Sequence, residues 1–597
     1  MTAVLAVVAC LGAAPAAASR TDQVRREART LAREVAAPWG PDRQYSNGEF
    51  VDEVGGHSSY GEAVLGYALI SEGIREHDAE KVSTGLRAMH YATNRYSSAN
   101  GAVSVFQNMA VGFTYRLAEK RLPDDSDWRS IRSTVRSFMR RQPLVRLRPH
   151  PPHFGNHLIV ESLEVVNFVR SGLTSSNSSA ILGPDRGRNY AAARDFVQDD
   201  VPHLFAGDVV RSGGESTLLL SDPPDKPLAY QGLSIGLYAR AMELLSSSGK
   251  AEVALKRALE ASWRLVAPDG DMSYFGRNQE EAWTLAATAY AARIAEKLPN
   301  TSPSQRTRFE ALARRALERI RDVHLGGPGG IWPIPALRID LRKGTDAVDH
   351  GGFAPYGGLA LMFLNMLADT EAPKDASGDE VYADRSGAAV LGKGESLFAV
   401  QRAGPIWMAV RSGPSVQRPT DIRYDGGLLL VKRLQNDGTW ADLLPTRPRL
   451  PLHGNDSAGP LIVRNKRGTA VFSGHRITPH GSKGLTMVGA YRALRGDPGI
   501  KHFSHERFRP VDCGAQVSFP ARGGDVVENS VFLRRTGPYS TGGGEVVSGG
   551  TRVTTDPPAR VVIEKDYRSA TDPDVIRARL RWSVDADRTI KVRICTA

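Results

Sequence analysis

The hydrophobic period of this sequence changes once, near residue 370, and this change limits the possible folds more than any other feature. Before it, apolar side chains recur every three to four residues, which indicates amphipathic helices. After it, short β-branched and aromatic runs alternate with turn residues, which indicates strands. A chain of 597 residues is also too long for one hydrophobic core. We therefore expect a helical domain followed by a β-domain.

The first half of the chain contains a series of helix-like segments. In residues 60–76, Val64, Leu65, Ala68 and Leu69 share one helical face. Similar patterns occur at residues 81–96, 102–118, 128–139, 157–169, 230–245, 251–265, 280–297, 304–323 and 357–367. Roughly ten to twelve helices joined by short turns must pack as antiparallel hairpins, which can wind into a solenoid or close into a ring. We predict an incomplete (α/α) toroid over residues 19–370.

The second half contains strand-like segments. Residues 371–384 are rich in Ala, Asp and other small or polar residues, and we interpret them as a linker. Strand patterns follow at residues 388–391, 396–402, 406–411, 427–433, 461–464, 469–472, 485–494, 526–534, 551–554, 561–565 and 575–583. Turn residues recur between them about every eight to twelve residues, a spacing typical of two packed antiparallel sheets. We predict an antiparallel β-sandwich over residues 385–597.

The N-terminus resembles an export signal. Residues 3–14 are largely apolar, Pro15 ends the run, and small residues follow. The run is too short to span a bilayer, and its pattern is that of a signal peptide over residues 1–18. We expect a secreted protein; the alternative is a lipoprotein anchored at Cys10, which follows a loose lipoprotein cleavage box. No other segment of the sequence is long and apolar enough to cross a membrane.

Three cysteines are present, and removal of the leader would leave Cys513 and Cys595. In an oxidising compartment these two could close one disulfide. The sequence has neither a Cys-x-x-Cys motif nor a Cys/His spacing that would bind zinc. Thiol chemistry is therefore not the expected function.

The charge of the chain favours an anionic partner. Lys and Arg number 77 against 65 acidic residues, a formal net charge of +12. Charge alone fits nucleic acid, a membrane surface or an acidic polysaccharide equally well. Export, and the lack of a basic stretch interleaved with aromatic residues, disfavour nucleic acid. We expect an acidic polysaccharide or oligosaccharide as the partner.

One segment combines polar groups with a predicted helix start. Residues 148–157 lead directly into an apolar helix, and Asn156 is a natural N-cap for it. The same position suits ligand binding, because a helix N-terminus favours an anion. There the amide of Asn156 and the imidazole of His157 could hold a carboxylate. Glu161 lies four residues after His157 on the same helical face and could orient its ring.

Three short motifs together resemble the heparinase II/III and alginate-lyase type of polysaccharide lyase. They are Asn156-His157 at a helix start, Gly213-Gly214-Glu215, and Leu228-Ala229-Tyr230. The resemblance implies a helical toroid with a C-terminal β-sandwich. It also implies that Asn156 and His157 neutralise a uronate carboxylate and that Tyr230 transfers a proton. Residues 268–277 resemble a toroid loop that lines the cleft, which makes Tyr274 and Arg277 candidate substrate-binding residues.

The chemistry of such a lyase explains these residue types. The enzyme removes the proton at C5 of a uronate and expels the 4-linked oxygen by β-elimination. Donors around the carboxylate stabilise the charge that develops, as in an oxyanion hole. A phenol has an unperturbed pKa of about 10, so a tyrosine base needs cationic neighbours. This chemistry requires no cofactor.

The sequence departs from the family in its β-domain. Many members carry a His-x-His-x-Asp stretch there, and residues 421–425 retain only its Asp. The zinc site of the family is therefore not carried over, and a structural divalent metal has no support in the sequence. The candidates for a catalytic group in the second domain are His475, His480 and Tyr491, of which Tyr491 is also a predicted substrate-binding residue. His502 and His505 supply only two ligands and do not make a metal site.

Two other functions fit parts of the sequence. A toroid glycoside hydrolase would need two carboxylates across the scissile bond. Acidic residues near predicted loops are Asp52, Glu53, Glu62, Asp269, Asp271 and Glu280. A non-catalytic glycan-binding protein of the cell surface is the second alternative. Only a lyase leaves a conjugated double bond in its product. The sequence does not specify the uronate, endo or exo action, or the oligomeric state.

Overall fold

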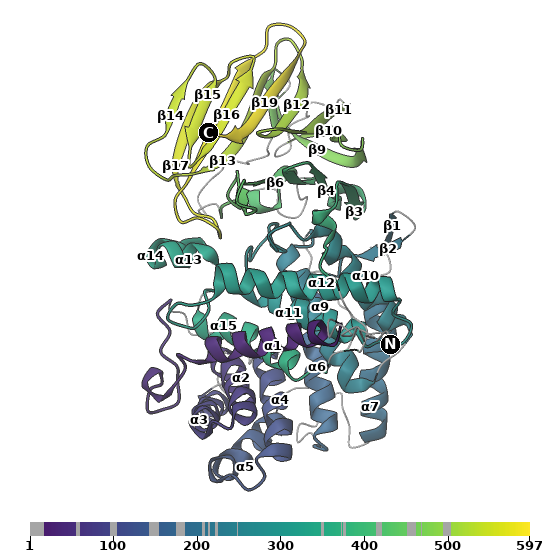
Figure 1. Cartoon of the computed structure of the whole chain (residues 1–597), viewed down its shortest axis with the longest axis vertical. Helices are drawn as coiled ribbons and strands as arrows, with labels where there is room; N and C mark the ends of the chain where they lie inside the picture. The colour runs from purple at the N-terminus through teal and green to yellow at the C-terminus, as the bar shows by residue number, and fades with distance from the viewer. Residues whose placement is uncertain are drawn as a thin grey trace, which may run out of the picture.

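A helical domain and a β-domain lie one above the other along the long axis of the molecule (Figure 1). The structure is a computed structural model. It describes residues 17–54, 60–95, 104–141, 155–174, 186–205, 209–212, 215–220, 225–246, 249–347, 352–371, 373, 378–413, 421–449, 461–466, 468–493 and 503–597. The predicted signal peptide lies outside these residues except for its last two, which begin the first helix.

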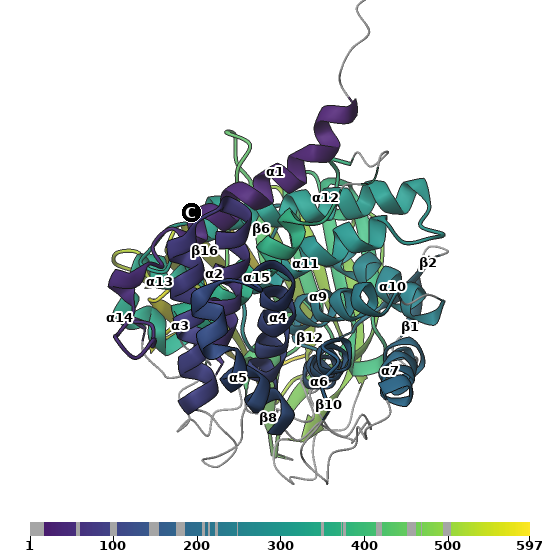
Figure 2. The ribbon, with the colours of Figure 1, turned by 90° about the horizontal axis from the view of Figure 1, so that it is seen from below.

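Long helices of the first domain alternate between an inner and an outer layer. The inner helices are α2 (Gly61–Glu76), α4 (Val105–Arg121), α6 (Gly155–Arg170), α9 (Leu228–Leu245), α11 (Ala282–Glu296) and α15 (Phe353–Ala368). The outer helices are α1 (Ala17–Ala36), α3 (Ala79–Arg95), α5 (Ser126–Arg141), α7 (Arg186–Asp195), α10 (Lys250–Leu265) and α12 (Pro303–Arg319). Each inner helix contacts the next, and α15 contacts α2, so the inner layer runs around a complete circuit (Figure 2). The predicted toroid is confirmed.

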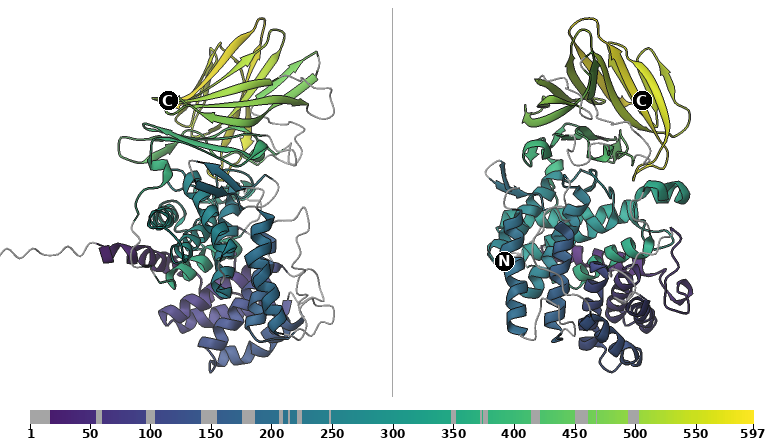
Figure 3. Two further views of the ribbon diagram at one scale, coloured as in Figure 1. Left: turned by 90° about the vertical axis from the view of Figure 1, so that its right-hand side faces the viewer. Right: turned by 180° about the vertical axis from the view of Figure 1, so that it is seen from behind.

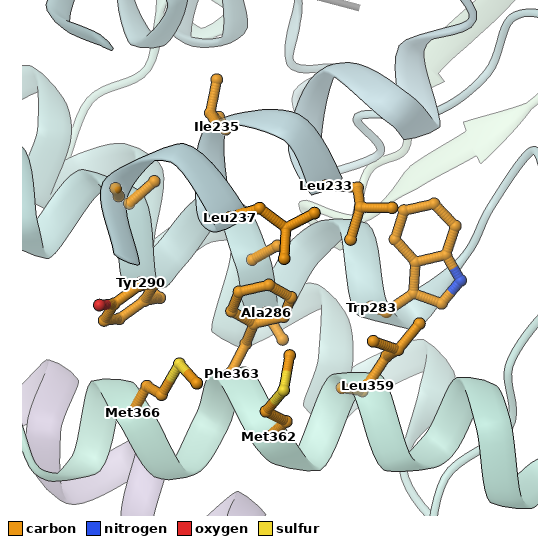
Figure 4. Close-up of a cluster of buried hydrophobic side chains, with 14 of the residues drawn as sticks. Leu233, Ile235, Leu237, Trp283, Ala286, Tyr290, Leu359, Met362, Phe363 and Met366 are labelled. Atoms are coloured by element: carbon orange, nitrogen blue, oxygen red, sulfur yellow. The ribbon is translucent and has the colours of Figure 1, made fainter. Parts of the chain in front are cut away.

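The inner helices are buried on nearly every side because their sequences are apolar or small all round. Every residue of α11 is buried, and alanines make up much of its length. Close approach is visible at Gly236 of α9, where a Cβ atom would lie 2.7 Å from the Cβ of Ala287. Figure 4 shows Leu237, Tyr290 and Phe363 meeting where α9, α11 and α15 pack together.

The six inner helices run in the same direction, because each outer helix returns the chain to the end from which it came. Their N-termini therefore gather at one end of the toroid. At α9 and α11 this end faces the β-domain: the N–H of Leu228 donates to the carbonyl of Phe275, and the N–H of Gly276 donates to the carbonyl of Arg423, at 3.0 and 3.1 Å. A helix N-terminus carries a partial positive charge, so this end favours an anion.

The β-domain contains a small and a large antiparallel sheet. The small sheet has the order β3 (Gly387–Leu391), β4 (Phe398–Ala403), β5 (Ile406–Arg411), β6 (Gly427–Leu434) and β7 (Trp440–Asp442). The large sheet has the order β14 (Ser540–Gly542), β15 (Glu545–Ser548), β16 (Thr551–Asp556), β19 (Arg588–Thr596), β12 (Gly514–Ala521), β11 (Phe503–Val511), β10 (Leu485–Ala493), β9 (Gly468–Pro479), β8 (Leu461–Asn465), β13 (Val526–Arg534), β18 (Val575–Ser583) and β17 (Arg560–Tyr567). The predicted sandwich is confirmed.

The small sheet is a middle layer between the helices and the large sheet (Figure 3). Strand β5 shows why. Trp407 and Ala409 face the core of the helical domain, whereas Met408 and Val410 face the core of the β-domain. Because side chains alternate between the two faces of a strand, a strand that is apolar at every position is covered on both sides. The small sheet therefore joins the two domains through apolar contacts.

The two cysteines of the β-domain form a disulfide. It links Cys513, in the turn before β12, to Cys595 on β19. These two strands are neighbours in the large sheet, and Gly514 is the register partner of Cys595. The disulfide that the sequence allowed is therefore present, while Cys10 lies outside the described residues.

A buried network of alternating charges crosses from the toroid to the small sheet. Lys432 of β6 is fully buried, and its Nζ lies 2.8 Å from Asp269, which follows α10; it also contacts Asp442 of β7. At the end of α12, Arg319 pairs with Asp269 and, at 2.9 Å, with Glu280. Burial alone would raise the pKa of Asp269, but the two cations hold that pKa well below its usual value. The network therefore fixes the loop between α10 and α11 against the β-domain.

The sequence patterns missed several elements. Among the helices these are α1, α7, the short α8 (Val201–Leu204), α13 (Pro335–Ile339) and α14 (Leu341–Gly344). The missed strands are β7, β11, β12, β14, β15, β19 and a hairpin of β1 (Val209–Ser212) and β2 (Glu215–Leu218) inside the helical domain. Strand β11 has Ser504 and Glu506 among its buried positions and mostly charged or polar side chains at its outward positions, so it lacks an apolar run. Strand β19 does alternate, with Ile590, Val592 and Ile594 buried, and could have been found.

The interface network makes a prediction about stability. Replacing Lys432 by Ala leaves Asp269 and Asp442 buried without the lysine between them, and this should lower the free energy of unfolding by about 3–5 kcal/mol. Thermal or urea unfolding measures the change. The control is Lys250→Ala, because Lys250 pairs with Asp199 at the surface; its effect should stay below about 1 kcal/mol. Equal effects of the two substitutions would contradict a stabilising role of the network.

Candidate functional site

Aromatic side chains line the N-terminal end of the inner ring. The ring centroids of Tyr60, before α2, and Phe106 of α4 are 5.3 Å apart, and those of Phe106 and His157 of α6 are 6.1 Å apart. A hydrogen bond joins the hydroxyls of Tyr60 and Tyr356, and Tyr356 belongs to the first turn of α15. Burial raises the pKa of Tyr60 to about 12. The starts of four inner helices thus meet in one cluster.

Tyr230 lies in the first turn of the next inner helix, α9. It is mostly buried, with 7% of its surface exposed, and its ring packs edge-on against Trp283 of α11, with centroids 5.8 Å apart. The guanidinium carbon of Arg277 lies 4.3 Å from the centroid of the Tyr230 ring. Tyr230 and Tyr356 are also close enough to interact electrostatically. The fold therefore brings Tyr230, a predicted catalytic residue, together with Arg277, a predicted substrate-binding residue.

The β-domain holds the segment that leads into Tyr230. Arg411 of β5 is fully buried, its Nη2 lies 3.3 Å from Asp225, and its guanidinium carbon lies 4.3 Å from the Phe275 ring centroid. Gly276 completes the contact: its φ is +83°, and a Cβ atom there would lie 2.4 Å from Cβ of Pro227. Only glycine lets the loop that carries Arg277 approach the start of α9 so closely.

Backbone strain concentrates beside this contact. Within the described residues, eight non-glycine residues have positive φ, and four of them, Asp225, Lys226, Asn278 and Glu280, lie in the two loops that precede α9 and α11. Each such residue costs of order 1–3 kcal/mol and persists only where its surroundings fix it. In these loops, Asp225 is held by Arg411 of the small sheet, and Glu280 is held by Arg319. Strain of this kind is common at functional sites.

Helix α6 carries the other predicted catalytic residues, and α6 contacts α9 in the inner ring. Asn156 is buried, with 2% of its surface exposed, whereas His157 is exposed. Glu161 is half-buried one turn later, and burial raises its pKa to about 7. His157 and Tyr230 are 73 residues apart in sequence but belong to the first turns of adjacent inner helices.

Two predicted substrate-binding residues are placed elsewhere. The hydroxyl of Tyr274 donates to the carbonyl of Leu265 at 2.9 Å, and its ring packs against Trp407 of the small sheet, so Tyr274 is part of the domain interface. Tyr491 of β10 is buried in the core of the β-domain against Phe472. Burial raises the pKa of both hydroxyls. Both side chains therefore make structural contacts, which periodicity could not reveal, because it does not show which loop and strand positions face inward.

The described histidines of the β-domain lie on the outside of the large sheet. His475 of β9 is exposed and contacts the ring of Phe503, and His480 in the turn after β9 contacts Thr486 at 2.9 Å. His505 of β11 is half-buried, and His502 lies outside the described residues. Within the described part of the chain, no three His, Cys, Asp or Glu side chains are grouped as metal ligands would be.

The carboxylates that a hydrolase would need are mostly engaged in structural contacts. Asp269 and Glu280 belong to the interface network, and Asp271 is buried beside them with a strongly raised pKa. Asp52 accepts from the N–H of Ala354 at 2.8 Å and so caps the start of α15. Glu53 pairs with Arg43. Glu62 is buried in the first turn of α2, two residues after Tyr60.

Three further residues of this end escaped sequence analysis: Tyr60, Tyr356 and Glu281. Glu281 is buried and raises the pKa of both tyrosines electrostatically, after the larger effect of burial. A signal was present, since each lies at or beside the start of an inner helix, as Tyr230 does. We call Tyr60, Phe106, His157, Tyr230, Arg277, Glu281, Trp283 and Tyr356 the mouth cluster.

Two cavities outside the mouth cluster stand out in the described structure. One, of about 770 Å³, opens on the outside of the toroid between α8, the β1–β2 hairpin and α10. The other, of about 50 Å³, lies between the two sheets of the β-domain. The Gly213-Gly214 part of the second motif lies outside the described residues, next to the β1–β2 hairpin. Neither cavity contains a residue of the mouth cluster.

Comparison with solved structures finds a polysaccharide lyase among the matches. The chondroitin AC lyase of Streptomyces coelicolor A3, solved in complex with chondroitin sulphate, is 12% identical, with a TM-score of 0.51 over 98% of this chain and 80% of that chain. This chain has the fold of that lyase. The resemblance to polysaccharide lyases that join a helical toroid to β-sheets is therefore confirmed at the level of the lyase fold.

Two other solved structures match this chain with lower TM-scores. The heparan sulfate lyase HepC from Pedobacter heparinus is 10% identical, with a TM-score of 0.46 over 97% of this chain and 84% of that chain. The α-1,6-mannanase GH76A from Salegentibacter sp. HEL1_6 is 12% identical, with a TM-score of 0.37 over 58% of this chain and 100% of that chain. No protein-family model and no curated protein matches the sequence. Within the described residues, no helix has the length and apolar character needed to cross a bilayer.

A buried carboxyl on α6 makes a prediction about pH. Burial raises the pKa of Glu164 to about 8, and Asn108 donates to it at 3.1 Å. The folded chain therefore holds this proton more tightly than the unfolded chain, so the free energy of unfolding should fall as the pH rises from about 4.5 to about 8. The Glu164→Gln variant has no carboxyl group to ionise at this position, so its free energy of unfolding should not fall in this way. Relative to the wild type, its stability should rise by roughly a few kcal/mol between pH 5 and pH 8.

Urea unfolding at several pH values tests this prediction. The control is Glu80→Gln on α3, because Glu80 is exposed, and its pH profile should follow the wild type. Parallel profiles for the wild type and Glu164→Gln would show that Glu164 is not held protonated in the folded protein.

Proposed function

We propose that this chain is a secreted polysaccharide lyase that cleaves a uronate-containing anionic polysaccharide by β-elimination. The observation that carries the proposal is the mouth cluster, in which Tyr230 packs beneath Arg277 at an end of the toroid where six helix N-termini gather. The shared fold with a chondroitin AC lyase supports the reaction class. The apolar run at residues 3–14 supports export.

The proposed mechanism assigns a role to each group. The helix N-termini and the side chains of Asn156 and His157 hold the uronate carboxylate and stabilise the negative charge that develops on it. Tyr230, as a phenolate beside Arg277, removes the proton from C5. The C4–O4 bond then breaks, which leaves a C4–C5 double bond, and the Tyr230 hydroxyl returns a proton to the expelled oxygen and becomes a phenolate again. Glu161, one turn after His157, helps to orient the imidazole.

The same geometry disfavours a hydrolase. Hydrolysis of a glycosidic bond needs an acid and a base or nucleophile, usually two carboxyl groups that flank the bond. Asp271 and Glu280 are buried in the domain interface, and Asp269 beside them is half-buried and paired with Arg319 and Lys432. The mouth cluster contains three tyrosines, Arg277 and a single carboxylate, Glu281. Incubation with chondroitin sulphate, heparan sulphate, hyaluronan, alginate, pectic polymers and glucuronan should give ultraviolet absorbance from the new double bond on at least one of them. New reducing ends without this absorbance would indicate a hydrolase.

Replacing Tyr230 by Phe tests the base directly. The change removes only the hydroxyl, and kcat should fall by about 10²- to 10⁴-fold. The matched control is Tyr274→Phe, which removes a buried hydroxyl that bonds to a backbone carbonyl in the domain interface. That control should lower the unfolding temperature but leave kcat within about twofold, since the lost hydrogen bond affects stability by about 1 kcal/mol. A Tyr230→Phe enzyme with full turnover would exclude the proposed base.

Replacing Arg277 by Gln tests the cation above the ring. A positive charge at this distance favours the phenolate over the phenol. Without it, the midpoint of the rise of kcat with pH should move upward by about one unit. Arg338→Gln removes the same charge from an exposed position on α13 and should leave the midpoint unchanged. A profile that does not move in Arg277→Gln would mean that Arg277 acts on binding alone.

A further inference from the structure

The large sheet has a strongly basic outer face. Strand β11 alternates between buried side chains, such as Glu506 and Phe508, and outward side chains that include Arg507 and Arg509. The outward positions of the neighbouring strands follow from their register. We call the following residues the basic face: Arg476 of β9, Arg507 and Arg509 of β11, and Lys591 and Arg593 of β19.

Strand register places these cations in two rows. Ser518 of β12 pairs with Arg507 on one side and Lys591 on the other, and Gln516 of the same strand pairs in the same way with Arg509 and Arg593. Arg593 donates to the side chain of Gln516 at 3.0 Å, which confirms that they share a face. Since strands are about 4.8 Å apart, the two cations of each row are about 10 Å apart across β12.

Little negative charge balances this face. On the outward positions of β9, β10, β11, β12 and β19, all within the described residues, no side chain is acidic. Lys591 pairs with Asp556 of β16 at 3.1 Å, but Arg476, Arg507 and Arg509 have no ion-pair partner within the described part of the chain. Like charges on one sheet face repel one another, so an anionic chain laid across the face would relieve this repulsion.

One edge of the basic face also offers an apolar contact. Phe503 has 76% of its surface exposed, more than any other large apolar side chain of the described residues, and its ring contacts His475. His505 lies between Phe503 and Arg507 along the same side of β11. Burial, and then the nearby Arg507, lower the pKa of His505. An exposed aromatic ring beside cations is suited to a sugar ring that carries acidic groups.

The basic face begins close to the loops that hold Tyr230. At the bulge of β9, just before His475, the N–H of Gly474 donates to the carbonyl of Gly413 at 3.2 Å. Gly413 follows Arg411 by two residues, and Arg411 pairs with Asp225 in the loop before α9. A polymer that left the mouth of the toroid on this side would therefore meet cations of the large sheet.

We infer that the outer face of β9, β11 and β19 is a second binding site for an anionic polysaccharide, separate from the mouth cluster, which holds the polymer while it is cleaved. The inference rests on the proposed function for the identity of the polymer. The ligand at this site is a flexible polymer with regularly spaced carboxylate or sulphate groups, whose sugar rings pack on the ring of Phe503.

The test measures binding of chondroitin sulphate to the full chain carrying Tyr230→Phe, so that the polymer is not consumed. Adding Arg507→Gln and Arg509→Gln should weaken binding by about tenfold and reduce its dependence on salt, because two charge contacts are lost. The matched control adds Arg129→Gln and Arg136→Gln on α5, which are exposed and remove the same net charge; it should change the affinity less than about twofold.

Three results would overturn the inference. The first is that the Tyr230→Phe chain does not bind chondroitin sulphate at low salt. The second is that the Arg507/Arg509 and Arg129/Arg136 variants lose the same amount of affinity for it. The third is that the chain binds duplex DNA more tightly than chondroitin sulphate. An unchanged unfolding temperature shows that the sheet is intact. The proposed function is judged separately by ultraviolet absorbance with the unmodified enzyme. If the unmodified enzyme is active but the Arg507/Arg509 variant binds chondroitin sulphate as tightly as its Tyr230→Phe parent, only the second site is refuted. If the Arg507/Arg509 variant binds more weakly than its parent but the unmodified enzyme shows no turnover, only the lyase proposal is refuted.

Discussion

The direction of the inner helices is the constraint on which the candidate site depends. Each hairpin of the toroid places one helix inside and returns the chain outside, so all six inner helices start at the same end. Residues that are far apart in sequence, such as Tyr60, Tyr230 and Tyr356, therefore meet there. The partial positive charges of the helix starts add to those of Arg277 and favour an acidic ligand. The ring thus supplies both the position and the electrostatic character of the mouth.

The β-domain completes this end of the toroid through its small sheet. That sheet is apolar on both faces, so it cannot separate from either neighbour without exposing a core. Buried charges are paired across the same contact: Arg411 with Asp225, and Lys432 with Asp269. These pairs hold the strained loops before α9 and α11. Tyr230 and Arg277 therefore depend on a domain to which neither belongs.

The positive charge of the chain is not spread evenly over the surfaces that matter for the proposed function. At the mouth it comes from helix starts and from Arg277, a single cation that lies on an aromatic ring. On the large sheet it comes from alternate residues of neighbouring strands, which the register brings into rows. The two surfaces have different geometry, one built from helix starts and one from the face of a sheet, yet both suit a polymer with repeated acidic groups.

The sequence by itself determined the order of the domains, the toroid and sandwich classes, and the helix starts at Asn156-His157 and Tyr230. Local periodicity and turn residues carry this information, because they depend only on near neighbours in the chain. Only the tertiary structure decided that Arg277 lies over Tyr230 while Tyr274, three residues earlier in the same loop, is buried against the small sheet. Side-chain direction in an irregular loop has no period. It is fixed by packing against β5 and α9, whose residues are distant in sequence.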